Sequence, residues 1–198
     1  MKLPREFYTR ADVVQISKAL LGKYLFTRID GNLSSGIIVE TEAYCGRGDK
    51  ACHANNKRTP RTEVMYAAGG KAYVYLCYGI HHLFNVVTNE EGSADAVLIR
   101  ALEPVHGLDW MLLRREYPQL KPALTAGPGA MSAALGITTK LYGQDLLGDT
   151  IWIEDHGMKV KEADIIASPR VGVQYAEEDA LRPWRFRIKG NTYTSPAK

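Results

Sequence analysis

Two glutamates and a tyrosine alternate in the run VETEAY, as Glu40, Glu42 and Tyr44. Residues two apart in an extended strand share one face, so the sequence predicts that these three side chains project together. A pair of solvent-facing glutamates is the ordinary explanation for such a pattern. The chemical alternative is that Tyr44 forms a pocket wall, beside which Glu42 acts as a general base.

Three tyrosines occur within the six residues YVYLCY. Tyr73 and Tyr75 share one face of a predicted strand, and Tyr78 falls at its end beside Gly79. Aromatic residues on a strand usually pack into the core, but a tyrosine at a strand end can also reach into solvent or a groove. Rings in such a place can stack on nucleic-acid bases, so both interpretations stay open.

Polar residues also fall on a predicted hairpin that follows. Alternation places Leu98 and Arg100 on one face, with Asn85 on the facing strand. Partly buried arginine and asparagine side chains usually make structural hydrogen bonds. They equally suit the lining of a substrate pocket.

A metal site is a further alternative, because histidines and cysteines occur near these segments. Its candidate ligands are Cys45, Cys52, His53, His81 and His82, whose spacing matches none of the compact zinc patterns. A surface loop position is the ordinary explanation for His53. We expect no metal and no cofactor, and we interpret the three cysteines as thiols of a reducing compartment.

The elements that must position these residues can be read from periodicity and turn residues. A helix is predicted to begin at a capping box of Thr9 and Asp12 and to end at Gly22. Strands are predicted at 24–29, 35–44, 71–80, 82–88, 94–104, 150–155, 163–169 and 184–190, and further helices at 107–117 and 131–137. Strands outnumber helices without regular alternation. We therefore expect one mixed α/β (α+β) domain over residues 1–198, built around a curved, largely antiparallel sheet.

Composition narrows the class of protein. The 198 residues are 45% hydrophobic and carry a net charge of only +3. Basic residues form two clusters that could contact phosphate or could simply be solvated, namely Arg47, Lys50, Lys57, Arg58 and Arg61, and Arg182, Arg185, Arg187, Lys189 and Lys198. No apolar run is long enough to cross a bilayer, and no signal peptide is evident, so we expect a soluble cytoplasmic protein without membrane association.

The ordered series VETEAY, His53, RTPR, YVYLCYG, Asn85, VLIRALEP, GPG and RVGV resembles the alkyladenine (3-methyladenine) DNA glycosylase family. The resemblance extends from about Val13 to Lys189. It implies a compact α/β fold with a curved antiparallel sheet and a projecting β-hairpin that binds DNA. It also implies a monomer that acts in base excision repair on double-stranded DNA containing damaged purines, nucleoid-associated in a bacterium.

The resemblance assigns roles to single residues. Glu42 would position and deprotonate the nucleophilic water, and Arg100 would help to hold it. The extruded base would lie among Tyr44, His53 and Tyr75. Asn85 would disfavour the exocyclic amine of guanine, and Tyr78 would enter the minor groove as a wedge that fills the vacated stack.

The implied reaction is hydrolysis of the N-glycosidic bond, which leaves an abasic site. No lysine stands where the family would attack the sugar, so no Schiff base and no strand cleavage are expected. The substrates would include 3-methyladenine, 7-methylguanine, hypoxanthine and ethenoadenine, without a ranking among them. A rival is a module of this fold that binds lesions without excising them, but such a module is expected to have lost the glutamate at position 42.

Overall fold

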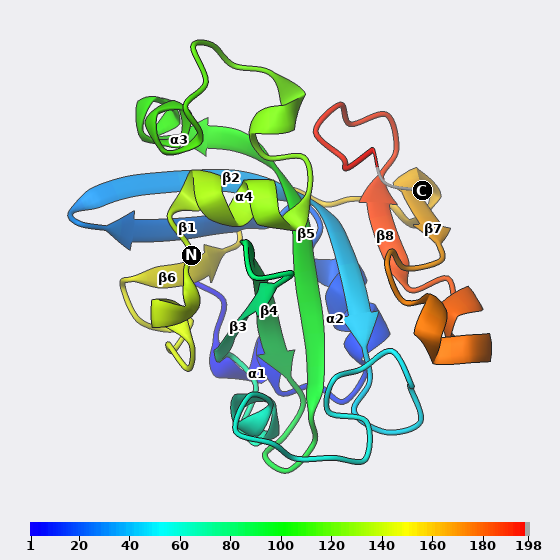
Figure 1. Ribbon diagram of the computed structural model, residues 1–198. Coiled ribbons are helices and arrows are strands. Elements are labelled where there is room, and N and C mark those ends of the chain that lie inside the picture. Colours follow the sequence, from blue (N-terminus) through cyan, green and yellow to red (C-terminus); the bar gives the residue numbers. More distant parts are fainter. Residues whose placement is uncertain (197–198) are drawn as a thin grey trace.

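A computed structural model describes residues 1–196 (Figure 1). The first residues of the chain lie along the edge of a large sheet, where Lys2 pairs with Glu154. A short helix α1 (Arg5–Tyr8) precedes α2 (Val13–Leu20). The predicted capping box is wrong, because Thr9 ends α1 and Asp12 itself caps α2, accepting hydrogen bonds from the N–H groups of Val14 and Gln15.

Eight antiparallel strands form one sheet, which confirms the α+β class and the antiparallel sheet expected from the sequence. The central path runs β3-β4-β5-β2-β1-β6, and β8 pairs with both β2 and β7. The strands are β1 (Tyr24–Ile29), β2 (Asn32–Tyr44), β3 (Ala72–Cys77), β4 (His81–Thr88), β5 (Asp95–His106), β6 (Ile151–Glu154), β7 (Ile165–Ser168) and β8 (Arg185–Ile188).

The long strand β2 determines how the sheet branches. Its first half pairs with β1, and its second half lies between β5 and β8 (Figure 1). The β2–β5 register shifts at Ser35/Gly36 and on both sides of Glu40, and such bulges bend a strand. At the first shift, a Cβ atom on Gly36 would stand only 2.7 Å from the carbonyl oxygen of Glu103, so a glycine allows the two backbones to approach.

Helices cover the sheet and complete one compact domain. α2 packs against β2 and β5, α4 (Pro128–Leu135) packs against β4 and β5, and α3 (Leu108–Arg115) packs against α4. The main core is formed by buried apolar side chains from these helices and strands. Short 3₁₀ segments were not anticipated from the sequence; they lie at η1 (Glu63–Tyr66), η2 (Pro122–Leu124), η3 (Thr139–Leu141), η4 (Glu162–Asp164) and η5 (Gln174–Leu181). Among the described residues, no helix has the length and apolar character to cross a membrane.

A polar cluster around Asp145 fastens α1 to the sheet. Its carboxylate accepts hydrogen bonds from Arg5 Nη2 at 2.6 Å and from Lys71 Nζ at 2.9 Å. The same arginine donates to the carbonyl oxygen of Gly69. Burial alone would raise the pKa of Asp145, but the N–H of Leu147 and the two cations lower that pKa to about 2.

The lowered pKa of Asp145 predicts a pH-dependent contribution to stability. A carboxyl group with a depressed folded-state pKa stabilises the fold above its unfolded pKa of about 3.9 and loses this contribution as the pH falls through about 2. After allowance for solvent screening of the partly exposed cluster, we expect Asp145→Asn to cost about 1 kcal/mol, or about 2–4 °C in Tm, at pH 7. Thermal denaturation should show this difference shrinking below pH ~4. A difference that is independent of pH would contradict the assignment.

Candidate active site

Glu40 and Glu42 lie in the half of β2 that runs between two other strands. Glu42 is paired with Leu98 of β5 on one side and with Arg185 of β8 on the other. Both glutamate side chains are fully buried. The explanation of a solvent-facing pair is therefore wrong, and each carboxylate needs partners inside the protein.

Arg100 lies between the two carboxylates. Its Nε is 2.8 Å from Glu40 Oε1, and its Nη1 is 3.3 Å from Glu42 Oε1. The contacts confirm that the two glutamates share a face, as strand alternation predicts. They also bring the arginine of β5 and the glutamates of β2 together across the sheet.

Glu40 is saturated with hydrogen bonds. Besides Arg100, its carboxylate accepts from Arg185 Nε at 2.8 Å and from both the N–H and the hydroxyl of Ser195, at 2.5 and 2.9 Å. Burial would raise the pKa of Glu40, but Arg100, Ser195 and Arg185 together hold it below its usual value. Glu40 is thus stabilised as an anion at the centre of a buried network.

Glu42 is held differently, by groups that also line a cavity. Tyr44 Oη donates to Glu42 Oε2 at 2.7 Å, and the backbone N–H of Val171 donates to Oε1 at 2.8 Å. Tyr44, Val171 and Arg100 all line the adjacent cavity. The Glu42 carboxylate therefore lies beside the cavity, in contact with three of the residues that line it.

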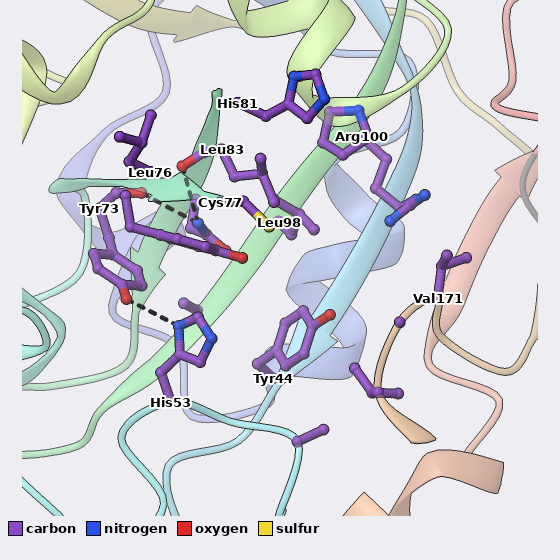
Figure 2. A pocket seen from close by; sticks show the side chains of 18 of the residues that line it. Tyr44, His53, Tyr73, Leu76, Cys77, His81, Leu83, Leu98, Arg100 and Val171 are labelled. Atoms are coloured by element: carbon purple, nitrogen blue, oxygen red, sulfur yellow. Dashed lines mark hydrogen bonds between the residues drawn. The ribbon is translucent and has the colours of Figure 1, made fainter. Parts of the chain in front are cut away.

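The cavity has a volume of about 600 Å³ and an aromatic, largely uncharged wall. Figure 2 shows Arg100 and Val171 on the same side of it as Tyr44, with His53 and Tyr73 on the other side. Apart from Glu42, all the site residues predicted from the sequence line this cavity, namely Tyr44, His53, Tyr75, Tyr78, Asn85 and Arg100. Concave sites with a few polar groups are the usual places for small ligands.

His53 is part of an aromatic cluster. Its Nδ1 is 3.0 Å from Tyr73 Oη, and its ring meets that of Tyr75 edge-on with centroids 4.7 Å apart. Burial, together with the positive charges of Arg61 and Lys57, lowers the pKa of His53 to about 4. The imidazole is therefore neutral at pH 7. Burial also raises the pKa of Tyr73, so the contact is a hydrogen bond between two neutral groups, in which the histidine tautomer decides which group donates.

Asn85 and Leu98 both line the cavity and are paired between β4 and β5. Nδ2 of Asn85 donates to the carbonyl oxygens of Tyr73 and Leu83, at 3.2 and 3.5 Å. These bonds fix the side-chain amide relative to the tyrosine strand.

Tyr78 stands at the tip of the β3–β4 hairpin, with 88% of its surface exposed. Tyr78 and Gly79 have φ values of 52° and 73°, and the N–H of Ile80 donates to the carbonyl oxygen of Cys77. The loop has three residues, 78–80, and the two successive positive φ values resemble those of the central residues of a type I′ turn. The turn extends the tyrosine ring into solvent at the rim of the cavity, beside the exposed Ile80.

The remaining alternatives from the sequence can be compared with the structure. Cys45, Cys52 and Cys77 are free thiols. Within residues 1–196, no three His, Cys, Asp or Glu side chains are grouped so that they could hold a metal ion.

The basic clusters are partly used inside the protein. Lys50, Arg58 and Arg182 pair with Glu177, Glu63 and Asp179, respectively, and Arg185 is buried against Glu40. Lys198 lies outside the described residues.

Sequence reasoning missed four contributors to the site. The N–H of Val171, the phenol of Tyr73 and Ser195 act through backbone or hydroxyl groups that no residue-type pattern reveals. The fourth is a buried pair of Arg170 and Asp49. In the sequence, Arg170 and Val171 were indicated only by the run RVGV, as one of the motifs of the family resemblance.

Comparison with known proteins decides the family of this chain. The methylpurine-DNA glycosylase (MPG) family profile matches residues 6–192. The chain belongs to this family. Methylpurine-DNA glycosylases act in DNA repair, and this family member is a hydrolase of N-glycosyl bonds.

Bacterial relatives agree along nearly the whole chain. The chain is 48% identical to a protein of Chlamydia felis (strain Fe/C-56), covering 94% of this chain and 95% of that protein. It is 46% identical to one of Bacillus cereus (strain G9842), covering 98% and 99%. Both relatives carry the name "Putative 3-methyladenine DNA glycosylase". The family resemblance inferred from the sequence is thereby confirmed.

The saturated network around Glu40 predicts a large effect on stability. Glu40→Gln removes the carboxylate charge that Arg100 and Arg185 share, and breaking a buried ion pair by neutralising one partner costs about 3 kcal/mol. Urea denaturation should show this loss in the free energy of unfolding. Glu63→Gln is the matched control, since Glu63 is exposed and its ion pair with Arg58 lies at the surface. Equal stability of the two variants would refute a structural role for Glu40.

Proposed function

We propose that this glycosylase is monofunctional and extrudes damaged purines from duplex DNA into the aromatic cavity, where it hydrolyses the N-glycosidic bond. The observation that carries the proposal is Glu42, a fully buried carboxylate held beside this cavity by Tyr44, Val171 and Arg100. A buried carboxylate that structural cations do not saturate is suited to proton transfer. The product is an abasic site.

In this proposal, Glu42 accepts a proton from the water that attacks the sugar. Arg100 lines the cavity within 3.3 Å of that carboxylate, so it can also orient the water. A base stacked in duplex DNA is out of reach of any such group, so the nucleotide must leave the stack first.

The cavity walls suit a flat purine, including a cationic one. Tyr44 and Tyr75 offer aromatic faces, and His53 is neutral at pH 7, so its ring adds no positive charge that would repel an alkylated base. Nδ1 of His53 is engaged by Tyr73, so Nε2 is the ring nitrogen proposed to hydrogen-bond the edge of the base. Asn85, fixed by two backbone carbonyls, is proposed to disfavour the exocyclic amine of guanine.

Tyr78 is proposed to enter the minor groove. Its exposed ring at the tip of a two-stranded hairpin stands at the cavity rim, where it can fill the gap that an extruded nucleotide leaves. Inserted apolar or aromatic side chains are a common means of unstacking a base step.

Hydrolysis without strand cleavage is supported by the cavity lining. In the described part of the chain, the lining contains no lysine that could attack the sugar carbon. The proposed site residues all come from one chain, so a monomer would be sufficient. The proposed substrates are 3-methyladenine, 7-methylguanine, hypoxanthine and ethenoadenine in double-stranded DNA, acted on without a cofactor.

Glu42→Gln tests the catalytic role. We expect this variant to bind a duplex containing 1,N6-ethenoadenine or hypoxanthine as the wild type does, but to release the base about 10²–10⁴-fold more slowly, because the proton acceptor is lost. Single-turnover assays should score free base and strand nicks separately, with Glu63→Gln as control. Release at the wild-type rate would remove Glu42 from the mechanism, and nicking would contradict a monofunctional enzyme.

Tyr78→Ala tests the wedge. Loss of the ring removes the group that fills the vacated stack, so we expect about tenfold weaker binding of a lesion duplex, in line with ~1–3 kcal/mol for an aromatic–base contact. Tyr78→Phe retains the ring and should bind nearly normally. Titration of a fluorescent duplex measures both variants, and unchanged affinity of Tyr78→Ala would exclude the wedge.

A further inference from the structure

Arg170 is a buried arginine that joins several segments around the cavity. Its guanidinium makes a two-pronged ion pair with Asp49, at 2.6 and 2.7 Å, and both side chains are fully buried. It also donates to the carbonyl oxygens of Ala43 in β2 and of Asp179, each at 2.9 Å. The N–H groups of Cys45 and Ala51 complete the partners of Asp49.

The same guanidinium lies over the ring of Tyr44, 4.8 Å from its centroid. Tyr44 lines the cavity, whereas Arg170 is absent from the lining in the described residues. Figure 2 shows Tyr44 between the His53 side of the cavity and the segment of Val171, the residue that follows Arg170. Tyr44 therefore has the Arg170 cation over its ring and also borders the cavity.

A charged group on one face of an aromatic ring interacts electrostatically with a base that stacks on the other face. A base on the open face of Tyr44 would lie within about 8 Å of the guanidinium, a distance at which two like charges still repel appreciably inside a protein. Asp49 cancels that charge through its two hydrogen bonds. The balanced pair thus fixes the ring without opposing a positively charged base, and tyrosine rings attract cations through their faces.

We propose that Arg170 and Asp49 are positioning residues that also set the preference of the cavity between cationic and neutral damaged purines, an inference that rests on the proposed function. Arg170 holds Tyr44 and the Val171 segment in place. Asp49 keeps the back of the ring electrically neutral, so that a base with a fixed positive charge is accepted.

The experiment compares single-turnover release of 7-methylguanine, whose nucleoside is cationic, with that of hypoxanthine, which is neutral. Both bases are placed opposite cytosine in one duplex sequence. Asp49→Asn leaves the charge of Arg170 uncompensated, so the ratio of cationic to neutral release should fall by about three- to tenfold. Arg170→Met leaves Asp49 negative, so the ratio should rise. The double variant, Asp49→Asn with Arg170→Met, removes both charges and should return the ratio towards that of the wild type.

Two further variants separate charge from general damage to the fold. Arg170→Lys keeps the positive charge and should keep the ratio even if both rates fall. Asp145→Asn weakens a remote polar cluster and should leave the ratio unchanged. Thermal melts establish which variants are folded at the assay temperature. If Asp49→Asn is not folded, the inference is tested by the rise of the ratio in Arg170→Met and by its return towards the wild-type value in the double variant.

Two results would have different meanings. If both rates fall together in Asp49→Asn and in Arg170→Met while their ratio stays constant, the pair is structural only and the inference is overturned. If the wild type releases neither base, the proposed function fails, whatever the variants do.

Discussion

The site depends on one guanidinium, that of Arg100, which is shared by two buried carboxylates on a single strand. Removing two anions from water is costly unless cations and hydrogen bonds replace the solvent. That requirement explains why β5 supplies Arg100, β8 supplies Arg185, and a segment near the C-terminus supplies Ser195. The bend and partner change of β2 bring these groups to one place.

The two glutamates differ because their partners differ. Glu40 is surrounded by two arginines and a serine, so its charge is fixed and its position is rigid. Glu42 is held by a phenol, a backbone N–H and the far end of Arg100, all of which also face the cavity. One strand thus presents a structural anion and, two residues later, an anion that is held by groups of the cavity wall.

Alternation along the strands was sufficient to place Glu40, Glu42 and Tyr44 together and to face Asn85 with Leu98. It could not tell which face was buried, so the glutamates alone suggested a surface. The partners contributed by Ser195 and Val171 lie more than 120 residues away and act through hydroxyl or backbone groups. Local patterns carry no information about such contacts. At α2, the predicted capping box failed because the sequence did not reveal α1, whose end is Thr9, so that Asp12 caps α2.

The contact between Glu40 and Ser195 joins positions 155 residues apart. Translation therefore places the glutamate outside the ribosome long before its last hydrogen-bond partner exists. Until β8 and the residues after it are made, a growing chain holds the β2 carboxylates with an incomplete set of counterions. Non-local pairings of this kind slow folding, because a long loop must close before the contact is formed. The charge balance of the site is thus among the last features that the newly made protein acquires.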